Sequence, residues 1–151
     1  MSIQDSVANV LNAGAIERLL DTRFPQIHAN GRHLIEEVMP QWTRVRLKAD
    51  GRNVRPGGSV SGPAMFTLAD FSVYVAIIGR IGESGIDAVT TNMNISFLAK
   101  PEVGDITCKV RLLRVGRKLA VAEAELTSSG TGRIVARAVA TYALPSEYEV
   151  K

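Results

Sequence analysis

The longest apolar stretch of the chain covers residues 63–78, where hydrophobic side chains occupy nearly every side of a helix. Its only polar side chains are Thr67, Asp70 and Ser72, together with the hydroxyl of Tyr74. A helix that is apolar all round is a buried helix. Because these 16 residues fall short of the roughly 20 that cross a bilayer, we expect protein to enclose this helix.

Alternating apolar and polar side chains predict one strand before this helix and four strands after it. In the first strand, residues 43–49, apolar side chains alternate with basic ones. The four later runs cover residues 89–97, 106–112, 120–126 and 134–144. Short turns separate these runs, and short connections join antiparallel neighbours. The expected fold class is therefore α+β, with helices on one face of an antiparallel sheet.

The N-terminal quarter of the chain has a weaker pattern. Residues 5–23 carry apolar side chains at helical spacing, interrupted near Gly14, which predicts one or two short helices. We expect a loop or an irregular arm over residues 24–37. The length of 151 residues predicts a single domain. We divide it into a helical arm over residues 1–37 and a core over residues 38–145.

The composition is that of an ordinary globular protein, with 46% hydrophobic and 22% charged residues. A net charge of +3, without aromatic residues interleaved among the basic ones, does not indicate nucleic-acid binding. The single cysteine, Cys108, excludes an internal disulfide framework and fits a reducing compartment. Cys108 lies in an alternating strand pattern, so we expect it in the core. Because the first residues lack the pattern of a signal peptide, we expect a cytoplasmic protein without a membrane partner.

Asp70 is the one carboxylate in the apolar helix. Burying an ionised carboxylate without a partner costs several kcal/mol or more, so its presence there needs a reason. The helix begins with Gly62 and Pro63, which suits the first turn of a helix. An oriented backbone N–H and an acid are candidate parts of an acyl-transfer site. Alternatively, Asp70 is a structural group that hydrogen-bonds a neighbouring loop.

The order of elements, together with Ser61-Gly62-Pro63 followed after four residues by Leu68-Ala69-Asp70, resembles a known enzyme family. The chain is similar, over roughly residues 42–145, to hotdog-fold acyl-CoA thioesterases of the phenylacetic-acid-degradation type. The resemblance implies a curled antiparallel sheet wrapped around the long helix, with an N-terminal helical extension. It also implies hydrolysis of an acyl-CoA thioester to a free acid and coenzyme A. No metal or other cofactor is expected, since coenzyme A is part of the substrate.

The same resemblance assigns roles to individual residues. The backbone N–H of Gly62 would bind the thioester oxygen, and Asp70 would attack the thioester or activate water. Thr90 stands where the family has a Ser or Thr that assists the acid.

Other positions depart from the family pattern. The family's His at the helix start is Ser61 here, and its second Gly is Pro63. An Asn that orients the catalytic water would align with Arg55, and Asn53 lies close enough to replace it. Lys100 belongs to a turn that resembles a family turn, and we expect Ser61, Arg55 and Lys100 to contact the substrate.

A group of basic residues is a candidate site for the nucleotide end of coenzyme A. Arg114, Arg117 and Lys118 flank one tight turn, and Arg133 begins a later strand. Guanidinium groups suit phosphate oxygens. The alternative for such a group of charges is a solvated face.

Spacing along the helix predicts a shared site. Asp70 follows Gly62 by eight residues, about 12 Å along a helix. Because an oxyanion donor and an acid must meet at one carbonyl carbon, a single helix cannot supply both. Two antiparallel copies could bring them together, so we expect a homodimer, with a dimer of dimers as the larger assembly.

Several alternatives remain open at this point. A non-catalytic acyl-CoA-binding protein is one, and a hydratase or dehydratase acting on enoyl or hydroxyacyl thioesters is another. The latter enzymes pair a His with an acid, whereas the only histidines here are His28 and His33. Without a Cys partner or a close pair of acids, each histidine is expected in a loop rather than at a metal. Four side chains of the helix either line a medium-chain or aryl acyl pocket or, at helical spacing, pack in the core: Met65, Phe66, Phe71 and Tyr74.

Overall fold

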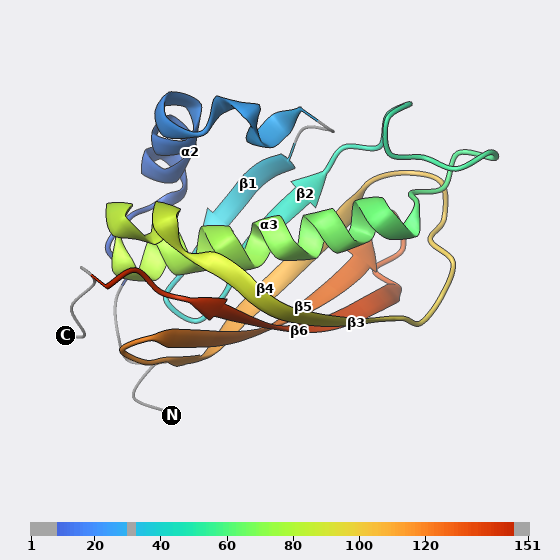
Figure 1. The fold of residues 1–151 in the computed structure, drawn as a ribbon. Coiled ribbons are helices and arrows are strands. Elements are labelled where there is room, and N and C mark those ends of the chain that lie inside the picture. The colour runs from blue at the N-terminus through green and yellow to red at the C-terminus, as the bar shows by residue number, and fades with distance from the viewer. Residues whose placement is uncertain (1–8, 30–32, 147–151) are drawn as a thin grey trace.

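The computed structural model describes residues 9–29 and 33–146 (Figure 1). Its helical segments are α2 (Ala13–Arg23), the 3-10 helix η1 (Pro25–His28), α3 (Gly62–Ile81) and the 3-10 helix η2 (Glu83–Asp87). Its strands are β1 (His33–Val38), β2 (Thr43–Leu47), β3 (Val89–Phe97), β4 (Ile106–Val115), β5 (Leu119–Ser128) and β6 (Ile134–Ala143). The strands form one antiparallel sheet in the order β1-β2-β4-β5-β6-β3.

Helix α3 lies across one face of the curled sheet, and α2 lies beside it (Figure 1). This arrangement confirms the expected α+β class and the hotdog fold. The side chain of Ser61 caps the helix by accepting a hydrogen bond from the N–H of Ala64, and Pro63 follows in the first turn. The helix ends at Gly82, whose φ of 91° favours glycine. Its second half is buried on all sides, from Phe71 to Arg80.

The length of α3 corrects the sequence-based prediction. It contains 20 residues, so by length and composition alone it could cross a membrane. However, 72% of its most apolar window is buried inside the protein, as in a core helix. The apolar sequence of α3 is therefore explained by its burial against the sheet, and its length is not needed for this conclusion. Cys108 is a core residue as expected, because it is fully buried and burial raises the pKa of its thiol to about 12.

Strand β1 is a second correction, because an irregular arm was predicted there. Its side chains do not alternate clearly between apolar and polar, so no strand pattern is visible in the sequence. Its pairing with β2 depends on groups that lie apart in the sequence. Glu36 accepts hydrogen bonds from Arg44 at 3.1 Å and from Arg46 at 2.9 Å, both on β2. Strand β1 thus forms by pairing with β2, and the sheet begins within residues 24–37, where a loop or an irregular arm was predicted.

The five predicted strands are confirmed, although their ends differ by a few residues. Strand β3 lies at an edge of the sheet and pairs only with β6. Two of its apolar residues are left uncovered, since Val89 is 59% exposed and Phe97 is 52% exposed, whereas Met93 and Ile95 are partly buried against the core. An open sheet edge with exposed apolar side chains is a surface suited to pairing with another strand.

Candidate functional site

Asp70 is held by two hydroxyl groups at the mouth of a pocket between α3 and the sheet. Its Oδ1 accepts a hydrogen bond of 2.8 Å from Thr90 Oγ1 and one of 2.5 Å from the Tyr142 hydroxyl. The Tyr142 hydroxyl also lies 2.9 Å from the backbone oxygen of Asp70. Among the described residues, no hydrogen bond to Asp70 Oδ2 occurs. One carboxylate oxygen is therefore anchored, and the other is available to a ligand.

The register of the sheet brings these groups together. Thr90 on β3 is paired directly with Tyr142 on β6, and Tyr142 in turn with Ala120 on β5. The register shifts between Thr90 and Asn92, and such a bulge changes the direction of nearby side chains. The predicted contact of Thr90 with the acid is thus present. The contribution of Tyr142 was missed, because the alternating pattern marked it only as a core position.

The pocket beside Asp70 has a volume of about 450 Å³ and is mainly apolar. Phe24 and Ile27 come from the N-terminal segment, Phe71 and Tyr74 from α3, and Ile86 from η2. The hydroxyl of Tyr74 donates a hydrogen bond of 2.6 Å to the backbone oxygen of Ile86. Burial raises the pKa of Tyr74 to about 12, so this phenol is neutral near pH 7. The pocket combines an apolar wall with a polar end at Asp70.

The start of α3 offers an unpaired backbone donor. Pro63 has no N–H, the N–H of Ala64 is bound by Ser61 Oγ, and that of Met65 by the Ser61 carbonyl. In the described part of the chain, the Gly62 N–H has no acceptor. The first N–H groups of a helix carry partial positive charge and bind anions.

Gly62 borders a separate pocket of about 350 Å³. Arg55 and Lys100 line this pocket, so the structure brings these two predicted substrate-binding residues to the predicted oxyanion donor. Phe97 closes one side of it, and a Cβ added to Gly62 would lie 3.6 Å from the Phe97 ring.

Asn53 and Ser61 form hydrogen bonds that hold the loop leading into α3. Asn53 is buried, accepts a hydrogen bond from the N–H of Asp50 and donates one to the backbone oxygen of Lys48. Its backbone oxygen accepts a hydrogen bond of 2.9 Å from the N–H of Ser61. Both residues line a small pocket of about 200 Å³ with Thr67. The side-chain amide of Asn53 therefore holds the loop, and its backbone oxygen ties this loop to the helix start that carries Gly62.

The structure separates the four predicted nucleotide-binding residues into two sets. Arg114, Arg117 and Lys118 lie at the β4–β5 turn, at the end of the sheet where Tyr142 meets Asp70. None of these three forms an ion pair with a described residue. Arg133 directly precedes β6 at the opposite end of the sheet and lies 3.6 Å from Glu102.

The two histidines lie behind the pocket wall. His33 is buried at the start of β1, and its ring stacks on Phe71 with centroids 4.8 Å apart. Burial, with a smaller effect of His28, lowers the pKa of His33 to about 4, so it is neutral near pH 7. The side chains of Glu17, Asp21 and His28 have possible ligand atoms within 4.8 Å of one another. Such exposed acidic groups are common without an ion, so they give no metal assignment.

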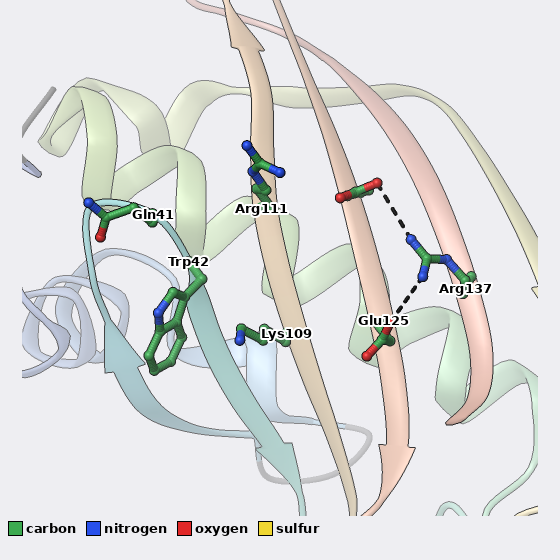
Figure 2. A pocket seen from close by; sticks show the side chains of 7 residues that line it. Gln41, Trp42, Lys109, Arg111, Glu125 and Arg137 are labelled. Atoms are coloured by element: carbon green, nitrogen blue, oxygen red, sulfur yellow. Dashed lines mark hydrogen bonds and ion pairs between the residues drawn. The ribbon is translucent and has the colours of Figure 1, made fainter. Parts of the chain in front are cut away.

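A further pocket of about 420 Å³ lies on the outer face of the sheet (Figure 2). Lys109 Nζ lies 4.8 Å from the centre of the Trp42 ring, within the range of a cation–π contact. Arg137 forms ion pairs with Glu123 and Glu125. Lys109 alternates along β4 with the buried Cys108, so this pocket faces away from α3 and Asp70. Its charges are largely paired with each other.

The profile of the thioesterase superfamily matches residues 57–135. Acyl-coenzyme A thioesterase 13 of Homo sapiens is 23% identical over 137 residues, which cover 90% of this chain and 89% of that protein. A candidate thioesterase from Silicibacter sp. TM1040, known from its crystal structure, is 39% identical with a TM-score of 0.80, over 91% of this chain and 94% of that chain.

A third similar protein is a hypothetical thioesterase of Streptococcus pneumoniae, crystallised with coenzyme A. It is 21% identical with a TM-score of 0.68, over 83% of this chain and 98% of that chain, which shows the shared fold. The superfamily profile covers more than half of the present chain. The chain therefore belongs to the thioesterase superfamily and is a thioester hydrolase with the hotdog fold.

Proposed function

We propose that the protein hydrolyses acyl-CoA thioesters with Asp70 as general base or nucleophile. The observation that carries this proposal is the anchored carboxylate of Asp70, which lines the pocket, with Oδ1 bound by Thr90 and Tyr142 and Oδ2 without a hydrogen bond to a described residue. The human relative is named an acyl-coenzyme A thioesterase, and the pneumococcal structure holds coenzyme A, which supports this substrate class.

The chemistry requires an acid and an oxyanion donor. As a base, Asp70 Oδ2 removes a proton from water while the water oxygen attacks the thioester carbon. As a nucleophile, Oδ2 attacks that carbon itself, and water later hydrolyses the mixed anhydride. In both routes the carbonyl oxygen becomes an oxyanion, which the Gly62 N–H stabilises. The C–S bond then breaks, and the coenzyme A thiolate takes up a proton.

We further propose that two subunits share each site. Gly62 and Asp70 open into different pockets of one protomer and are eight residues apart, about 12 Å along the helix. Edge strand β3 links the two pockets, since Thr90 near its start binds Asp70 and Phe97 at its end lines the same pocket as Gly62. Antiparallel pairing of two β3 strands would place the Asp70 pocket beside the partner's Gly62. A two-fold axis would produce two such sites.

This pairing would also bring the two sets of basic residues together at each site. Arg117 and Lys118, which form no ion pair with a described residue, lie at the Asp70 end of one subunit, whereas Arg55, Lys100 and Arg133 lie at the Gly62 end. In an antiparallel dimer, these two ends would meet at each site. We therefore assign the nucleotide end of coenzyme A to basic residues from both subunits.

The pocket lining indicates the acyl group. Apolar parts of its lining come from Phe24, Ile27, Phe71 and Tyr74, and the carboxylate of Asp70 lies at one end. Such a wall favours an apolar acyl chain or an aromatic ring, because each buried methylene contributes about 0.8 kcal/mol. A charged acyl group would lose its hydration without gaining an ion pair.

A screen of thiol release tests the proposed function. Purified protein and the Asp70→Asn variant would be assayed with short, medium, long and aryl acyl-CoA thioesters. We expect the wild type to release thiol steadily from apolar substrates, and Asp70→Asn to lose more than tenfold in kcat/KM, or more than about 1.4 kcal/mol of transition-state stabilisation. Binding of acyl-CoA without thiol release would instead favour the non-catalytic alternative. An active Asp70→Asn variant would refute the role of this acid.

A further inference from the structure

We propose that Tyr142 is a positioning residue that orients Asp70 for catalysis through its hydroxyl group. This inference rests on the proposed role of Asp70. The contact joins residues 72 positions apart, from α3 and β6, and it exists only in the folded sheet.

The geometry of the contact restricts the carboxylate. The Tyr142 hydroxyl lies 2.5 Å from Asp70 Oδ1 and 2.9 Å from the backbone oxygen of the same residue. Thr90 Oγ1 reaches the same Oδ1 from the other strand at 2.8 Å. Two donors on one oxygen fix the rotation of the carboxylate and leave Oδ2 without a hydrogen bond to any described residue. A catalytic group held in this way needs no reorganisation when substrate binds.

Tyr142 is itself held firmly. Its side chain is only 3% exposed, and its ring stacks on that of Tyr74 at a centroid distance of 6.4 Å. On the sheet, its neighbours are Thr90 and the small Ala120, which leave room for the ring. Burial and the nearby negative charge of Asp70 raise the pKa of Tyr142 well above its usual range. The phenol therefore remains a neutral donor and cannot act as the base near pH 7.

Tyr74 offers a matched comparison in the same pocket. Its hydroxyl donates to the backbone oxygen of Ile86 and does not contact Asp70. Both tyrosines line the pocket, and replacing either with Phe removes one buried hydroxyl from a similar environment. Among the described residues, the two tyrosines and Asp70 are the only titratable side chains that line it. Outside the wall, Asp87 raises and Arg23 lowers the pKa of Tyr74.

The experiment compares Tyr142→Phe, Tyr74→Phe and Asp70→Asn with the wild type in steady-state kinetics over a range of pH. We expect Tyr142→Phe to lower kcat about tenfold or more, with KM within about threefold of wild type, since a hydrogen bond to a charged group is lost. We also expect the acidic limb of its kcat/KM profile to move to higher pH, because the carboxylate loses a donor that favours its charged form. In Tyr74→Phe the acidic limb should stay in place.

The outcomes separate this inference from the proposed function. Wild-type kcat and an unchanged acidic limb in Tyr142→Phe would overturn the positioning role, as would equal effects in both Phe variants. Activity in Asp70→Asn would instead refute the proposed function. If Tyr142→Phe does not fold, 3-fluorotyrosine at position 142 alone keeps the ring and strengthens the donor. The acidic limb should then move to lower pH, and an unmoved limb would contradict the proposal.

Discussion

The Thr90 hydroxyl donates a hydrogen bond of 2.8 Å to Asp70 Oδ1, which joins edge strand β3 to the acid of the buried helix. We expect Thr90→Val to lower kcat about tenfold, because it keeps the side-chain shape but removes a donor to a charged group. Thr90→Ser retains the hydroxyl and should keep most of the activity. Steady-state thiol release would measure both variants. Equal losses in Val and Ser would point to packing of the methyl group instead of the hydrogen bond.

Subunit mixing tests the shared site. Asp70→Asn and Gly62→Pro should each be inactive alone, since proline removes the oxyanion N–H. A mixed dimer would contain one doubly damaged site and one intact site. Co-refolded mixtures should therefore regain up to about a quarter of the wild-type activity if subunits pair randomly.

Two results would contradict this expectation. An active monomer at assay concentration, measured by sedimentation, would refute the shared site. Absence of rescue in verified mixed dimers would place the donor and the acid on one chain. Circular dichroism of Gly62→Pro would serve as the control, because two consecutive prolines then begin α3.

Charge reversal tests Arg117 and Lys118 at the β4–β5 turn. We expect Arg117→Glu with Lys118→Glu to raise KM for acyl-CoA about tenfold or more, because attraction to the phosphates becomes repulsion. A truncated thioester without the nucleotide is the control substrate, and its KM should change little. The effect on acyl-CoA should weaken at high salt. Equal effects on both substrates would identify these residues as a solvated face.

Phe24 tests the role of the N-terminal segment in substrate choice. Its ring contacts that of Tyr74 edge to face, with centroids 6.3 Å apart, and forms part of the pocket wall. Phe24→Ala should enlarge the pocket and shift the ratio of kcat/KM values toward longer acyl chains, roughly tenfold for one or two methylenes.

Leu19→Ala is the matched control for Phe24→Ala. Leu19 is packed against the core from α2 but does not line the pocket, so this variant should lower stability without changing acyl preference. An unchanged preference in Phe24→Ala would show that the N-terminal segment does not contact the acyl group.

The lowered pKa of His33 predicts that the folded protein loses stability in acid. Its folded-state pKa of about 4 lies below the usual 6.5, so below pH 6.5 the unfolded chain binds a proton that the folded protein excludes. The stability it contributes is full above pH 6.5 and is lost as pH falls toward 4. From the two pKa values, the loss between pH 7 and pH 5 is about 2 kcal/mol.

Urea unfolding at pH 7 and pH 5 would measure this loss in wild type and in His33→Phe. The variant should lack about 2 kcal/mol of the acid dependence. His28→Phe removes only the smaller cause of the lowered pKa of His33 and should keep most of the effect. An equal loss in wild type and His33→Phe would contradict the prediction.

The amino-acid sequence alone determined the long buried helix, the five alternating strands and the family. The periods of helix and strand are local properties, visible in neighbouring residues. A lone carboxylate at Asp70 and a glycine at the helix start are equally local signals. The contact between Thr90 and Asp70 followed from the family resemblance, not from the local pattern.

Only the tertiary structure decided which distant groups meet. Strand β1 lacks an alternating pattern and forms because β2 and its arginines pair with it. The buried hydroxyl of Tyr142 needs an acceptor, but its sequence position does not say which one. Arg133 is near Arg117 in sequence, yet β5 separates them by its whole length. Hydrogen-bond partners depend on strand register and on the packing of α3, and these properties are set by the whole chain at once.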